Sequence, residues 1–104
     1  MRQLTIDTRD NSCVVARLVD GDKTYEAISS SENRRPESIL NLIDQVVKEG
    51  KVTIQDVDEI YVEEGPGSYT GLKVGVSVAN ALSFALNRKV NGHEPETIVE
   101  PKYE

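Results

Sequence analysis

Residues 65–71 read Gly65-Pro66-Gly67-Ser68-Tyr69-Thr70-Gly71, and this is the most distinctive stretch of a chain of 104 residues. It follows residues 59–63, where Ile60 and Val62 alternate with polar residues as in a strand with one wet face. It precedes residues 71–87, whose apolar residues recur at the helical period. The stretch is therefore predicted to join a strand to a long helix, as in an α/β fold.

The glycine-rich loop admits two interpretations. Backbone N–H groups at the start of a helix could converge on an anion. The loop departs from the dinucleotide-binding fingerprint in its third glycine, and it is no Walker loop because Lys73 does not directly follow the last glycine. The alternative is a structural turn, in which Gly65 and Gly67 adopt backbone angles that other residues avoid and Ser68 or Thr70 caps the helix.

Three antiparallel strands are predicted in the first thirty residues. Residues 4–6 and 13–19 have β-branched character, and residues 8–12 between them have the composition of a turn. A second turn at residues 20–22 leads into residues 23–28, which alternate like a strand with one wet face. These segments are expected to form two successive hairpins.

A first helix is predicted to begin near Pro36, where the missing N–H of proline costs nothing, and to stop at Gly50. Its apolar stripe comprises Ile39, Leu42, Ile43 and Val46, widened by Leu40 and Val47. Residues 53–56 resemble a capping box, and residues 89–91 are predicted to add a last short strand. The predicted class is α/β, with a mixed five-stranded sheet whose first three strands are antiparallel and with two main helices.

The second helix is unusual because residues 74–87 contain no charged residue, whereas a surface helix normally has a charged face. Its small and apolar side is predicted to meet the sheet and comprises Leu72, Gly75, Ala79, Leu82 and Leu86. The other side mixes uncharged polar with apolar residues, as the centre of an interface does. The predicted docking face comprises Leu40, Val47, Lys73, Val76, Ser77, Asn80, Ser83, Phe84 and Asn87. The alternative is that the first helix covers this side within the monomer.

Composition argues against several classes of function. A formal charge of −6 opposes direct binding of nucleic acid, and the basic pairs Arg34-Arg35 and Arg88-Lys89 are too short to form a nucleic-acid patch. The sequence has neither an apolar run that could span a membrane nor a secretory signal, so we expect no membrane association and a cytoplasmic location. His93 has no second ligand at metal-binding spacing, so no metal site is expected. Cys13 lies in an apolar run and is expected to be buried.

The motif Gly-Pro-Gly-Ser-Tyr-Thr-Gly-Leu-Lys-Val-Gly at residues 65–75 resembles the signature of the TsaB (YeaZ) family. Ile6-Asp7-Thr8 resembles the end of that family's first strand, and the agreement in order and spacing extends from Leu4 to Gly92. The histidine that usually precedes the first helix of the family is absent from residues 34–38. The resemblance implies a single actin/Hsp70-like (ASKHA) N-terminal lobe over residues 1–92, followed by a partly ordered C-terminal tail at residues 93–104.

The resemblance also implies a function. It implies a non-catalytic scaffold subunit that binds TsaD in the modification of tRNA to N6-threonylcarbamoyladenosine (t6A), with TsaE reached through the complex. The family self-associates through the same helical region, so a homodimer is expected in isolation. No catalytic residue is expected, and Asp7 and Thr8 form a candidate phosphate-side turn.

Three points stay open on the sequence. A single lobe holds half of a nucleotide cleft, so no cofactor is expected except ATP or ADP at an interface with a partner. One alternative function is therefore a nucleotide-binding half-site completed by another chain, and a second is a homodimeric structural protein. The family's second lobe is missing from this sequence, and whether the protein is naturally this short is not decided.

Overall fold

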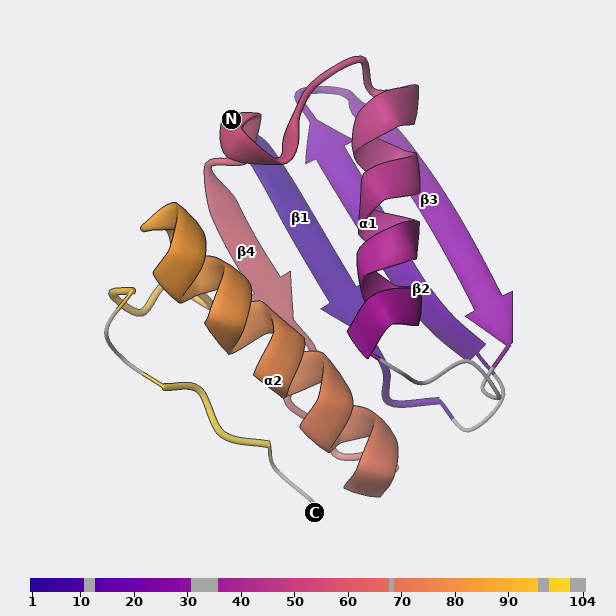
Figure 1. The fold of residues 1–104 in the computed structure, drawn as a ribbon, viewed down its shortest axis with the longest axis vertical. Helices are drawn as coiled ribbons and strands as arrows, with labels where there is room; N and C mark the ends of the chain where they lie inside the picture. Colours follow the sequence, from indigo (N-terminus) through magenta and orange to yellow (C-terminus); the bar gives the residue numbers. More distant parts are fainter. Residues whose placement is uncertain (11–12, 31–35, 68, 96–97, 102–104) are drawn as a thin grey trace.

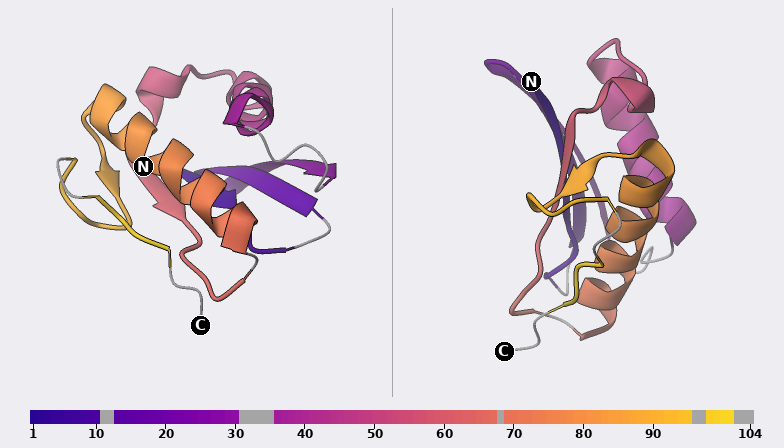
Figure 2. Two further views of the ribbon diagram at one scale, coloured as in Figure 1. Left: turned by 60° about the horizontal axis from the view of Figure 1, so that its bottom comes forward. Right: turned by 90° about the vertical axis from the view of Figure 1, so that its left-hand side faces the viewer.

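The computed structural model describes residues 1–10, 13–30, 36–67, 69–95 and 98–101. They form a five-stranded sheet in the order β3-β2-β1-β4-β5, with two helices lying on one of its faces (Figures 1 and 2). The strands are β1 (Arg2–Asp7), β2 (Cys13–Asp20), β3 (Lys23–Ser30), β4 (Glu59–Val62) and β5 (Lys89–Val90). The helices are α1 (Pro36–Glu49), the 3₁₀ turn η2 (Ile54–Asp56) and α2 (Tyr69–Leu86). The predicted fold class is confirmed.

The sheet is mixed, and its direction changes beside β1. β1 pairs antiparallel with β2, which pairs antiparallel with β3, whereas β1 pairs parallel with β4 and β4 with β5. Leu4 lies opposite Ile60 and Ile6 opposite Val62, and all four side chains are buried in the core beneath the helices. Because parallel strands end at the same edge of a sheet, the residues that follow β1 and β4 are neighbours.

Helix α1 starts at Pro36, as predicted, and packs on the strands through Ile39, Leu42, Ile43, Val46 and Val47. The helix ends near Gly50 as predicted, but Gly50 is not the residue that adopts the left-handed conformation at its end. Lys51 has the positive φ, 58°, and the bonds from Lys51 N to Lys48 O and from Val52 N to Val47 O close a Schellman motif. Gly50 is small for another reason, because a Cβ there would stand 2.8 Å from Cδ2 of Leu18.

Helix α2 starts at Tyr69, two residues before its predicted start. Thr70 therefore lies inside the first turn and not at the N-cap, while Ser68 is outside the described residues. The helix ends in the same motif as α1, with Asn87 at a φ of 55° and a bond from Arg88 N to Ser83 O. Asn87 thus terminates the helix, because asparagine tolerates the left-handed conformation better than most residues.

The chain after β5 turns back along α2. Asn91 and Gly92 have positive φ angles, and His93 then pairs with Val90 through two backbone bonds of 2.8 and 3.1 Å. Residues 98–101 run along the flank of α2 that faces away from α1 (Figure 1). Val99 is buried there, so this part of the predicted tail packs on the helix.

Candidate functional site

The glycine-rich loop and the turn after β1 lie against each other at one edge of the sheet. Gly65 has a φ of 123°, an angle that favours glycine, and precedes a cis peptide bond to Pro66. A Cβ on Gly67 would stand 2.8 Å from Cβ of Arg9 and 3.0 Å from its Cα and carbonyl oxygen. Only glycine lets the loop approach this backbone so closely, which supports the structural-turn interpretation for Gly65 and Gly67.

A second close contact joins the same turn to α2. A Cβ on Gly75 would stand 2.2 Å from Oγ1 of Thr8, so the helix backbone lies directly on this side chain. Thr8 is fully buried, and its Oγ1 has no hydrogen-bond partner among the described residues. Gly71 at the start of the helix is also buried. Thr8 is therefore part of the packing between β1 and α2.

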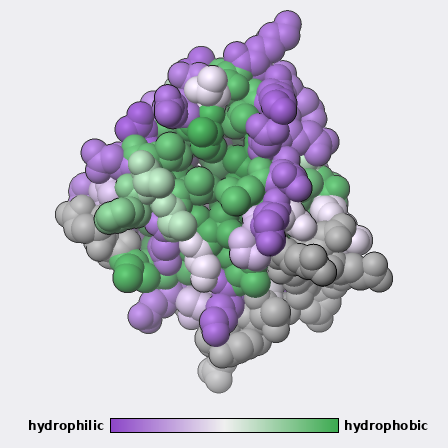
Figure 3. Space-filling model, in the orientation of Figure 1, coloured by the Kyte–Doolittle hydropathy of each residue, from purple (hydrophilic) through white to green (hydrophobic). Residues whose placement is uncertain are grey.

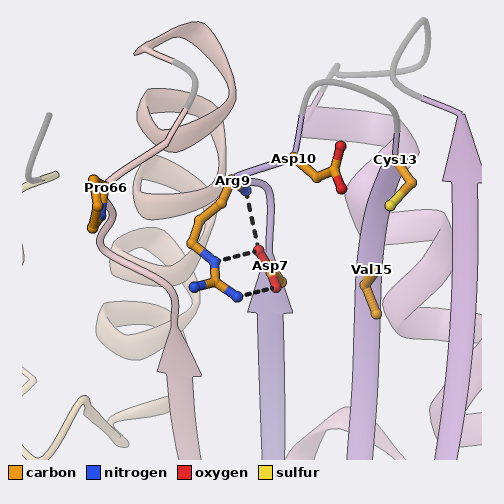
Figure 4. A pocket seen from close by; sticks show the side chains of 6 residues that line it. All are labelled: Asp7, Arg9, Asp10, Cys13, Val15 and Pro66. Atoms are coloured by element: carbon orange, nitrogen blue, oxygen red, sulfur yellow. Dashed lines mark hydrogen bonds and ion pairs between the residues drawn. The ribbon is translucent and has the colours of Figure 1, made fainter. Parts of the chain in front are cut away.

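Asp7, the other residue of the candidate phosphate-side turn, is bound by Arg9. The Arg9 side chain folds back over the end of β1, where Nε donates to Oδ1 at 3.2 Å and Nη2 to Oδ2 at 3.0 Å (Figure 4). The backbone N–H of Arg9 also donates to Oδ1, at 3.1 Å. Partial burial raises the pKa of Asp7, but the hydrogen bonds from Arg9 outweigh burial, so the pKa lies below its ordinary value.

An open pocket lies beside this pair. It is lined by Asp7, Arg9, Asp10, Cys13, Val15 and Pro66 (Figure 4). Arg9 supplies the positive charge of this lining, and its guanidinium is already bound to Asp7 and lies 3.7 Å from Glu63. An incoming phosphate would meet carboxylates and compete with Asp7 for Arg9, so the charges in this pocket disfavour an anion. The side chains of Ser68, Tyr69 and Thr70 lie outside the described part of the loop.

A different surface lies between the two helices. Side chains of α1 and α2 line an apolar groove, which Figure 3 shows as a hollowed green area bordered by purple residues. We define the helix groove by its lining nearer the start of α1, which comprises Pro36, Leu40, Ser77, Val78, Ala81, Leu82 and Ala85. It continues past Leu40 and Leu82 to Ile43, Val47, Val52 and Ile54, where the ion pair of Asp44 and Lys48 forms part of the rim.

The predicted docking residues fall into four groups in the structure. Leu40 and Ser77 line the helix groove, and Lys73, Phe84 and Asn87 are exposed outside it. Val47, Val76 and Ser83 are buried, and the Ser83 hydroxyl donates to the carbonyl oxygen of Arg88. Asn80 is half-buried and bonds to Val99. Val47 forms part of the groove floor, whereas Val76 and Ser83 are buried and do not line the helix groove, so the structure gives these two no place on the groove surface.

Sequence reasoning missed the centre of this surface. The prediction for the sheet-facing side is right for Leu72, Gly75 and Ala79, which are buried, but Leu82 and Leu86 are only partly buried. The helix is rotated so that Val76 and Ser83 also point inward and Ala81 points outward. A signal for the true groove was present, since Ser77, Ala81 and Ala85 recur every four residues on one helix face.

Arg88, the first residue of the basic pair after α2, has a structural role. Its Nε donates to the carbonyl oxygen of Val57 at 2.9 Å, and Nη1 donates to that of Leu86 at 3.2 Å. The guanidinium thus ties the end of α2 to the segment before β4. Within the described ranges, no three His, Cys, Asp or Glu side chains are grouped to hold a metal ion. Neither helix in this part of the chain has the length and hydropathy to span a bilayer.

Comparison with known proteins points to two related proteins of tRNA threonylcarbamoyladenosine biosynthesis, TsaD and TsaB. The family model of TsaD, tRNA N6-adenosine threonylcarbamoyltransferase, matches residues 29–92. The tRNA threonylcarbamoyladenosine biosynthesis protein TsaB of Haemophilus influenzae is 34% identical over 89 residues, which are 84% of this chain and 36% of that protein. The protein of the same name from Buchnera aphidicola subsp. Schizaphis graminum is 31% identical over 102 residues, 95% of this chain and 47% of its own length.

The fold is shared with a solved structure. YeaZ from Pseudomonas aeruginosa superimposes with a TM-score of 0.79 at 24% identity, covering 86% of this chain and 43% of that one. The chain thus spans less than half the length of the relatives described.

Proposed function

Because this chain belongs to the TsaB (YeaZ) family, we propose that it is a non-catalytic scaffold subunit that binds TsaD in the t6A modification of tRNA. The helix groove supports this proposal most strongly. Apolar side chains from two helices form a concave surface there, with no charged residue in the α2 segment from Val74 to Leu86. Such a surface fits an apolar helical partner, because removing the apolar side chains of both proteins from water lowers the free energy of the complex.

A nucleotide half-site has less support. Asp7 and the glycine-rich loop do lie together, but Arg9 is bound to both oxygens of Asp7 and the pocket is lined by a second carboxylate, that of Asp10. A homodimer built on the helix groove would use the same apolar surface and would compete with TsaD for it. The two assemblies can be separated by mass.

The test is the light-scattering mass of the purified chain, alone and mixed with TsaD of the same organism, with and without ATP. We expect a mixed species with the native chain and none with Ala81→Arg, because Ala81 is exposed in the groove and a buried unpaired guanidinium is costly. Thr24→Arg, which places the same charge on an exposed position of β3, serves as the control and should bind like the native chain.

Two outcomes would overturn the proposal. If the native chain forms no mixed species under any nucleotide condition, TsaD is not its partner. If Ala81→Arg binds TsaD as well as Thr24→Arg does, the helix groove is not the docking surface. Circular dichroism of each variant shows that a loss of binding is not a loss of fold.

A further inference from the structure

The segment at residues 98–101 is held on α2 by a specific contact. Nδ2 of Asn80 donates to the carbonyl oxygen of Val99 at 2.8 Å, and the N–H of Val99 donates to Oδ1 of Asn80 at 3.0 Å. The amide of Asn80 thus bonds to both backbone groups of one residue, as a neighbouring strand would. The Val99 side chain is 3% exposed, so a polar clamp and an apolar anchor act at the same place.

Two large apolar side chains near this anchor face the solvent. Phe84 is 78% exposed and lies one helical turn after Asn80, while Ile98 is 75% exposed and directly precedes Val99. The segment runs toward the N-terminal end of α2 (Figure 1). Ile98 precedes Val99 and therefore lies toward the C-terminal end of α2, as Phe84 does relative to Asn80. Along the backbone, both residues therefore lie on the side of Val99 nearer the C-terminal end of α2.

Three of the large exposed apolar residues of the described chain lie on or beside α2. Five large ones are exposed, namely Met1, Ile28, Leu40, Phe84 and Ile98. Leu40 lies in the helix groove on one side of α2, and Phe84 and Ile98 lie toward the other side, with Ser77 and Ala81 exposed between them. The apolar surface therefore continues from the groove across α2 to the anchored segment, and a contiguous surface of this kind marks an interaction site.

We propose that residues 98–101 form a third element of the docking surface, which Asn80 positions so that Ile98 and Phe84 contact the partner together with the helix groove. This inference rests on the proposed function and takes the same TsaD subunit as the occupant. The partner's facing surface must be apolar and uncharged at its centre, because a charge buried against the uncharged face of α2 would have no counter-ion. The alternative is that the segment only closes the flank of the lobe.

The test measures the dissociation constant for TsaD by calorimetry with four single variants of the full chain. Phe84→Ser and Ile98→Ser remove the exposed apolar side chains, and Asn80→Ala releases the segment. Ile28→Ser is the matched control, since Ile28 is 59% exposed but lies on β3. We expect each of the first three variants to weaken binding roughly tenfold and the control to leave it unchanged.

Hydrogen exchange at the Val99 amide separates positioning from packing, since it should accelerate in Asn80→Ala and stay slow in Ile98→Ser. The inference is overturned if Ile98→Ser and Asn80→Ala bind like the native chain, or if release of the segment tightens binding. If either result is found while Ala81→Arg still fails to bind TsaD, this inference is rejected and the proposed function stands. If the native chain itself fails to bind TsaD, both the proposed function and this inference are rejected.

Discussion

The hydroxyl of Thr8 lies so close to Gly75 that a Cβ added to the glycine would stand 2.2 Å from Oγ1. This contact joins the end of β1 to the second turn of α2 and sets how closely the helix approaches the sheet. Gly75 belongs to α2 and Thr8 to the buried turn after β1. A larger side chain at either position would therefore have to push the helix and the turn apart. The contact therefore makes the stability of the lobe sensitive to one methyl group.

Gly75→Ala should destabilise the protein by about 2–3 kcal/mol, because the new methyl group overlaps Thr8 and forces α2 away from β1. Urea denaturation measures the change. Thr8→Ala removes the overlapping atoms, so the double variant should recover at least about 1 kcal/mol of that loss. Strictly additive effects of the two substitutions would contradict the contact.

Ala79→Arg and Ala81→Arg should behave oppositely although they lie two residues apart on α2. Ala79 is buried against the sheet, so an arginine there should prevent folding. Ala81 is exposed, and its variant should keep a native circular dichroism spectrum and lose only partner binding. A folded Ala79→Arg protein would mean that α2 is rotated differently from this structure.

Lys51→Gly should stabilise the protein by about 0.5–1 kcal/mol, because Lys51 ends α1 in the left-handed conformation that glycine adopts without strain. Thermal unfolding should show a higher midpoint. Lys51→Ala is the matched control, since it removes the charged side chain but keeps the strained backbone angle. An equal gain in both variants would assign the effect to the side chain.

Asp7→Asn should lower the free energy of unfolding near neutral pH by about 0.5–1 kcal/mol, because it breaks the ion pair with Arg9 at a partly exposed site. The folded pKa of Asp7 is lowered, so the stabilisation is present above the unfolded pKa and is lost as pH falls through the folded value. The difference between native and variant should therefore shrink as pH falls below the ordinary aspartate pKa of about 3.9 and vanish only below the lowered folded pKa. Urea titrations at several pH values measure it, and a constant difference down to acid pH would exclude this ion pair as the cause.

Much of the fold followed from local patterns. The β-branched character of residues 4–6 and 13–19 and the alternation in residues 23–28 predicted the antiparallel strands, and the stripe from Ile39 to Val46 predicted the buried face of α1. These predictions were confirmed because strand and helix periods are properties of neighbouring residues. The glycine-rich motif also led to the TsaB (YeaZ) family, which the comparisons support.

The candidate site could be predicted only in part. An uncharged helix beside an amphipathic one with a wide apolar stripe indicated a two-helix surface, and both helices do line the groove. The helical wheel placed the buried Val76 and Ser83 on this surface as well, because a wheel gives the order of faces around a helix but not the angle at which the helix sits on a sheet. The role of Asn80 could not be inferred, since it depends on the return of residue 99 to α2.

The sequence by itself determined the order of strands and helices, the family and the uncharged character of α2, because each depends on residue type and spacing along the chain. Only the tertiary structure decided the rotation of α2, the burial of Val76 and Ser83, the pairing of Asp7 with Arg9 and the anchoring of Val99. Those features depend on which atoms meet when separate segments pack, and at Gly75 a single methyl group would change that packing.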